Sequence, residues 1–178
     1  VNQMRAMIAT IFHDPGLRFI FSTRSATPLI LDEAGKPFYG NDYRFVPGRD
    51  EIIRAGSEGY VLTYGEMLYR CLDVIEQLRS EGIQVGLINK PTLNVIDADM
   101  LAKMGAGKFV LVVETQNSKT GLGIRCGTWL MEKGYTTNYA HMGSHKEGRG
   151  GLGAQIPNQG IGRDKIHAKI LELCEQAL

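Results

Sequence analysis

Apolar and polar residues follow one another in blocks along the middle of the chain, and these blocks predict strands separated by helices. Short apolar runs at 60–64, 84–88 and 109–113 predict buried strands. Helical patterns lie between them, over Glu66–Glu81 and Asp97–Met104. Because each connection is long enough to carry a helix, we expect the three strands to be parallel.

The pattern continues toward the C-terminus. It predicts a helix from about 122 to 133, a strand at 136–141, a glycine-rich loop over 143–162, and a final amphipathic helix containing Ile166 and Cys174. Alternation of this kind is typical of α/β proteins. We therefore expect a three-layer fold with a mostly parallel (mixed) sheet and helices on both faces.

The first third of the chain has a different character. Residues 2–12 have the spacing of an amphipathic helix, and the short apolar run at 18–21 predicts a strand. The stretch over 28–56 indicates an ordered connector with little regular structure. The chain begins at Val1, and Met4 falls inside the predicted helix. This arrangement predicts that the N-terminus is a cut inside a larger protein.

Composition narrows the classes of function. The formal charge is +1, from 20 basic and 19 acidic residues, which gives no field for nucleic acid or an anionic membrane. The three cysteines, Cys71, Cys126 and Cys174, form no CxxC motif, and the apolar helical positions of Cys71 and Cys174 indicate buried thiols in a reducing cytoplasm. No apolar run approaches the ~20 residues that span a bilayer.

Several short motif matches fail in their context. Gly148–Gly153 has the letters GxGxxG, but Pro157 follows at once and too little chain remains for a second strand. Residues 105–108 have an incomplete P-loop pattern. His141, His145 and Glu147 have metal-ligand spacing but lie among glycines, so we interpret them as loop residues and expect no metal site.

A turn near the N-terminus carries the first candidate site. Ser22, Thr23 and Ser25 flank Arg24 after the predicted strand. A guanidinium in such a turn can bind an anion through two hydrogen bonds, and the neighbouring hydroxyl groups can add further bonds. A structural salt bridge is the alternative interpretation.

A second candidate site follows the strand at 109–113. Glu114 ends that strand, and Gly121 and Gly123 form a turn at the start of the next helix. A helix N-terminus favours an anion or a close approach of two backbones, so this turn is a candidate anion or interface site. Glycines that serve only tight packing of the helix on the strand are an equal alternative.

The order of these motifs resembles the transketolase family. Arg18–Pro28 resembles the end of the family's pyrimidine-binding domain, where a strand ends in a Ser/Thr–Arg pair. Gly59–Gly65, Ile83–Leu93 and Val112–Gly123 resemble three successive strands and turns of its C-terminal domain. The resemblance implies that residues 1–46 are the tail of a pyrimidine-binding domain with a connector, and that 47–178 form a transketolase C-terminal-like domain.

The resemblance also implies a function. The intact enzyme is expected to use thiamine diphosphate and Mg²⁺ to transfer a two-carbon ketol unit between sugar phosphates in a cytoplasmic pentose phosphate pathway. Arg24, with Ser22 and Ser25, is expected to bind the substrate phosphate. The chain contains no catalytic residue in this interpretation; it supplies a scaffold and dimer contacts.

Two family features are absent from the chain. The activating glutamate would precede Val1, and no Gly-Asp pair occurs for the metal–diphosphate motif. We therefore expect the isolated chain to bind no cofactor and to be inactive. The expected partners are the remainder of the enzyme or a separate N-terminal subunit, in a homodimer. The alternative is a non-catalytic subunit-contact or ligand-binding domain of a 2-oxoacid dehydrogenase-type or other thiamine enzyme.

Overall fold

The structure is a computed structural model, and it describes residues 2–23, 26–148 and 154–176. Within these ranges a five-stranded sheet has the order β1-β3-β2-β4-β5. The strands are β1 (Glu51–Arg54), β2 (Gly59–Thr63), β3 (Val85–Asn89), β4 (Phe109–Asn117) and β5 (Asn138–Ser144). Neighbouring strands are parallel except β1, which runs antiparallel to β3 at one edge.

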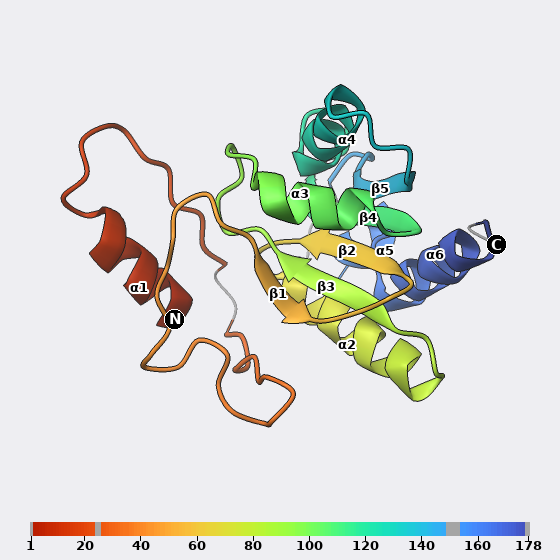
Figure 1. Ribbon diagram of the computed structural model, residues 1–178, viewed down its shortest axis with the longest axis horizontal. Coiled ribbons are helices and arrows are strands. Elements are labelled where there is room, and N and C mark those ends of the chain that lie inside the picture. The colour runs from red at the N-terminus through yellow and green to blue at the C-terminus, as the bar shows by residue number, and fades with distance from the viewer. Residues whose placement is uncertain (1, 24–25, 149–153, 177–178) are drawn as a thin grey trace.

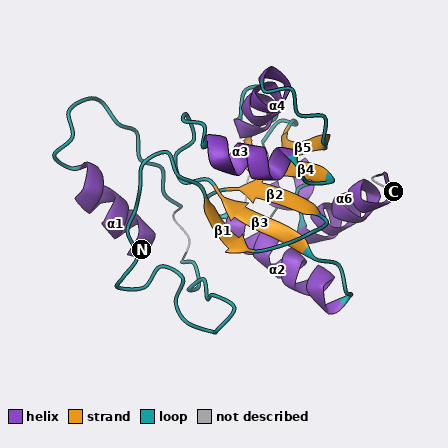
Figure 2. Cartoon of the chain, in the orientation of Figure 1, coloured by secondary structure: helices purple, strands orange, loops and turns teal. Residues whose placement is uncertain are grey.

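Helices cover both faces of this sheet, as Figures 1 and 2 show. The helices are α1 (Asn2–Ile11), α2 (Met67–Ser80), α3 (Ala98–Gly105), α4 (Leu122–Glu132), α5 (Gln155–Gln159) and α6 (Arg163–Gln176). Helices α3 and α4 lie on one face, and α2 and α6 lie on the other (Figure 1). The predicted three-layer α/β fold with a mixed, mostly parallel sheet is confirmed.

Each face of the sheet has its own hydrophobic core because successive strand residues point to opposite sides. In β2, Val61 packs against α2 and α6, whereas Leu62 packs against α3 and α4. Gly82 ends α2 in a left-handed conformation with φ of 87°. Asp97 precedes α3 as its N-cap, and its side chain accepts a hydrogen bond from the backbone N–H of Met100 over 3.2 Å.

Two predictions of secondary structure were wrong, and one was incomplete. Residues 18–21 form no strand, and Phe19 and Phe21 are each 77% exposed. An isolated extended segment gains no ladder of hydrogen bonds, so it is not a strand by itself. The connector contains a strand, β1, whose four residues are too few to show alternation. The loop over 143–162 contains α5, which has Pro157 in its first turn, where no helical N–H is required.

The N-terminal segment differs from the rest in its burial. Helix α1 buries none of its residues and lies outside the helix layers that cover the two faces of the sheet (Figure 1). Among the described residues, most of the large exposed hydrophobic side chains lie between positions 8 and 31. This apolar surface distinguishes the first third of the chain from the compact sheet and helices that follow.

Candidate functional site

A groove lies beyond the carboxyl ends of β2 and β3, where parallel α/β sheets bind ligands. Its cavity volume is about 170 Å³. Its lining comes from the start of α1, residues 21–23 and 27–30, Pro37 and Tyr39 of the connector, and the turn from β2 into α2 with Asn89 at the end of β3. The groove therefore joins the N-terminal segment to the sheet.

Glu51 accepts hydrogen bonds from several residues that line one side of this groove. Its Oε2 atom accepts hydrogen bonds from Tyr39 Oη at 2.8 Å, Asn89 Nδ2 at 2.8 Å and Gln3 Nε2 at 3.0 Å. Its Oε1 atom accepts a hydrogen bond from the hydroxyl of Tyr43. Burial, together with the adjacent carboxylate of Glu51, raises the pKa of Tyr39 well above its usual value. Both tyrosines therefore donate to Glu51 and bind the connector to β1, while Gln3 binds α1 to the same carboxylate.

The sequence did not identify this cluster. Its members come from α1, the connector and two strands, and Tyr39, Tyr43 and Glu51 resemble ordinary polar loop residues when read in order. Asn89 is the one member that could have been found from the sequence. It is a polar residue at the end of a buried parallel strand, where such sheets bind ligands.

The predicted phosphate site is described only in part. Ser22 lines the groove, so the Ser/Thr–Arg turn begins at the carboxyl edge of the sheet. Arg24 and Ser25 lie outside the described residues. Their expected role in binding a substrate phosphate stays a prediction.

The second predicted site forms a closed arrangement at the start of α4. Glu114 is fully buried, and its carboxylate accepts hydrogen bonds from the N–H groups of Leu122 at 2.8 Å and Gly123 at 2.7 Å. Tyr64 Oη donates a further hydrogen bond over 2.9 Å. The structure thus brings Glu114, Gly121 and Gly123 together, and the anion at this helix N-terminus is the protein's own carboxylate.

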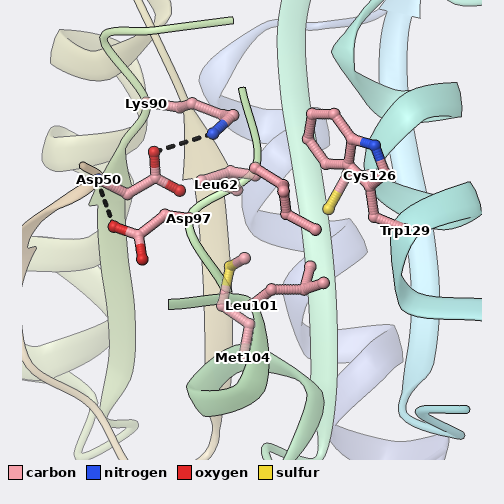
Figure 3. A pocket seen from close by; sticks show the side chains of 9 residues that line it. Asp50, Leu62, Lys90, Asp97, Leu101, Met104, Cys126 and Trp129 are labelled. Carbon is pink, nitrogen blue, oxygen red and sulfur yellow. Dashed lines mark hydrogen bonds and ion pairs between the residues drawn. The ribbon is translucent and has the colours of Figure 1, made fainter. Parts of the chain in front are cut away.

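A small cavity of about 10 Å³ lies on the opposite face of the sheet, under α3 and α4. Figure 3 shows Asp50 and Lys90 paired on one side of it and Cys126 with Trp129 on the other. Lys90 Nζ lies 2.9 Å from Asp50 Oδ1 and is 5.4 Å from the centroid of the Trp129 ring. Burial raises the pKa of Cys126 to about 12, so this thiol is protonated and unreactive at neutral pH.

Among the described residues, no group of three His, Cys, Asp or Glu side chains is placed to hold a metal ion. The N-terminus of α4, at the carboxyl edge of the sheet, is filled by Glu114 and is not open to a diphosphate. Neither a metal-ligand group nor the N-terminus of α4 therefore offers a site for thiamine diphosphate with its Mg²⁺ in the part of the chain that the structure describes. In the same part, no helix is both long and apolar enough to cross a membrane.

Comparison with known proteins finds a matching family model, similar sequences and a similar solved structure. Residues 48–166 match the family model of the transketolase C-terminal domain. A putative uncharacterized transketolase family protein of Sinorhizobium fredii is 34% identical over 132 residues, which are 73% of this chain and 36% of that protein. One of the subunits of the apulose-4-phosphate transketolase of Actinobacillus succinogenes is 29% identical over 97 residues, which are 54% of this chain and 31% of that protein.

A solved structure shares the fold. It is a split gene transketolase described as an inactive beta4 tetramer, with a TM-score of 0.75, 22% sequence identity and coverage of 85% of this chain and 48% of that one. The chain spans about a third of the length of the two relatives above.

Proposed function

Because the chain belongs to the transketolase C-terminal domain family, we propose that it is the C-terminal part of a thiamine-diphosphate-dependent transketolase-type enzyme. The whole enzyme transfers a two-carbon ketol unit between sugar phosphates. The match of residues 48–166 to the family carries this proposal, and the names of the relatives support the thiamine-enzyme context. Catalysis depends on the cofactor, with the protein supplying position and electrostatics.

The division of the chain is part of the proposal. Residues 1–46 form the tail of a pyrimidine-binding domain and a connector, and residues 47–178 form the C-terminal domain. The exposed apolar side chains between positions 8 and 31 support this division, since large exposed patches mark interaction surfaces. In the proposed enzyme, this surface packs against the remainder of the cofactor-binding domain.

The proposed substrate contact is Arg24. Ser22, at the start of the same turn, lines the groove at the carboxyl edge of the sheet, which supports a ligand role for this turn. Arg24 binds the phosphate of the sugar substrate, and Ser22 and Ser25 add hydrogen bonds. The groove then serves as the place where the two parts of the chain meet the substrate.

The proposed partner is the part of the enzyme that holds the cofactor, either on the same polypeptide or in a separate N-terminal subunit. A separate subunit is supported by the name of the Actinobacillus succinogenes relative, which is itself one subunit of a transketolase. The proposed assembly is a homodimer of the complete unit in the cytoplasm. Thiamine diphosphate and Mg²⁺ bind to the intact enzyme and not to this chain alone.

The test uses two preparations: the complete gene product with any partner subunit, and the 178-residue chain alone. The first should transfer a ketol unit from a ketose phosphate to an aldose phosphate when thiamine diphosphate and Mg²⁺ are present. Oxidative decarboxylation of a 2-oxoacid in its place would favour a 2-oxoacid dehydrogenase-type enzyme. Calorimetry on the isolated chain should detect no cofactor binding, and a micromolar dissociation constant would refute that part of the proposal.

A further inference from the structure

The ion pair between Asp50 and Lys90 is almost completely buried. Their side chains are 3% and 1% exposed, and the ammonium donates hydrogen bonds to Asp50 Oδ1 at 2.9 Å and to the carbonyl oxygen of Val95 at 2.8 Å. The ring of Trp129 on α4 lies on the third side. Lys90 therefore contacts three segments at a single point: the connector, the loop that precedes α3, and helix α4 (Figure 3).

The same end of the connector is bound on the other face of the sheet. In the antiparallel pairing of β1 with β3, Glu51 is opposite Asn89. Asp50 and Lys90 are the residues next to that pair, and they face α3 and α4 because adjacent residues of a strand point to opposite faces. Two neighbouring pairs thus hold the connector, Asp50–Lys90 on one face and Glu51–Asn89 on the other.

The contacts on the two faces of the sheet hold different parts of the chain. Glu51 holds Gln3, Tyr39 and Tyr43, which join α1 and the connector to the groove. Asp50 is held on the opposite face, where its backbone N–H donates to the Asp97 carboxylate over 2.8 Å. A shift of Asp50 would move Glu51, the adjacent residue, and with it the cluster beside the groove.

We propose that the buried Asp50–Lys90 pair is a latch that sets the position of the connector, so that breaking it on the α3 and α4 face releases the Glu51 cluster and opens the groove on the opposite face. Lys90 acts as a positioning residue, because it lies on the opposite face and does not line the groove. The latch is independent of the chemistry proposed for the whole enzyme, because it depends only on contacts within this chain.

The energetics of buried pairs give the latch a specific signature. Removing one partner leaves an uncompensated buried charge, whereas replacing both partners with apolar side chains of similar size is often neutral or stabilising. Lys90→Met and Asp50→Leu should each release the connector, and the double variant should hold it again. A purely additive response would mean that the two residues are not coupled.

The experiment measures release of the connector at pH 7 in the 178-residue chain. Hydrogen exchange of the backbone amides at 46–54 and tryptic cleavage of the Arg44–Phe45 bond, whose neighbouring residues no variant changes, both report local opening. Each single variant should speed cleavage and exchange by at least about tenfold, given the cost of an unpaired buried charge. The double variant should return both rates to within a few-fold of wild type, and exchange in β2 and β4 should stay slow throughout.

Lys108→Met is the matched control. Lys108 forms an ion pair with Glu58 at 2.7 Å, but this pair is exposed, so its loss should change neither rate. If a single variant does not fold, Asp50→Asn, which keeps an acceptor for Lys90, replaces Asp50→Leu and should give a smaller increase. Unchanged rates in the folded single variants, or a double variant as fast as the two singles combined, would overturn the latch.

Discussion

The carboxylate of Glu114 lies so close to the α-carbon of Gly121 that a methyl group added there would overlap both carboxylate oxygens. Gly121 is the residue before α4, and its φ of −79° is open to any amino acid. The requirement for glycine at this position is therefore steric and not conformational. The buried carboxylate and the glycine turn form one unit that caps the helix.

This relationship predicts the effect of Gly121→Ala. The added methyl group should displace Glu114 from the N–H groups of Leu122 and Gly123, with a loss of about 1–3 kcal/mol in the free energy of unfolding. Urea denaturation would measure the loss. In a chain that already carries Glu114→Ala, the same change should cost much less, because the clashing group is gone. Equal costs in the two backgrounds would contradict the steric explanation.

Glu114 itself should tolerate Gln better than Ala. Glu114→Gln keeps one acceptor for the buried N–H groups, whereas Glu114→Ala leaves two such groups unpaired, at about 1–3 kcal/mol each. The same urea titrations would rank the two variants. An alanine variant as stable as the glutamine variant would show that water satisfies the helix terminus.

The pH dependence of stability should contain a contribution from Asp50. Burial, opposed by Lys90 and reinforced by the nearby carboxylates of Asp97 and Glu51, raises the pKa of Asp50 to about 6. The folded chain then binds a proton more tightly than the unfolded chain, so this contribution is complete below about pH 4 and is lost as the pH rises through 6.

The expected loss between pH 4 and pH 7 is on the order of 2 kcal/mol. Asp50→Asn should remove this slope, which unfolding titrations at a series of pH values would detect. Acidification should open the latch no more than Asp50→Asn does, because the protonated acid also keeps a carbonyl oxygen for Lys90. A variant whose pH profile matches that of the wild type would exclude Asp50 as the source.

Arg24→Ala tests the proposed substrate contact in the intact enzyme. Loss of a charge-assisted hydrogen bond should cost roughly 1.5–3 kcal/mol of binding, which is about one to two orders of magnitude in affinity. The Michaelis constant for phosphorylated sugars should rise accordingly, while the melting temperature should change little. A structural salt bridge predicts the reverse, a lower melting temperature with normal kinetics. Measuring both quantities on this one variant separates the two roles.

Local patterns predicted most of the C-terminal part because its elements are long and regular. The apolar stripe of α2, from Met67 to Leu78, needs only the helical repeat to be recognised. The buried strands 60–64, 84–88 and 109–113 were placed to within a few residues and were parallel as expected. β1 was missed because its four residues form a strand only through pairing with β3.

The α/β alternation, the family and the closeness of Glu114 to the glycine turn could all be predicted from the chain, since each depends on residues near one another in it. Which distant residues meet follows only from the folded sheet. Asp50 and Lys90 are 40 positions apart, and separate segments deliver Tyr39, Glu51 and Asn89 to one cluster. Such contacts depend on strand order and register, which follow from packing across the whole sheet and leave no local pattern in the sequence.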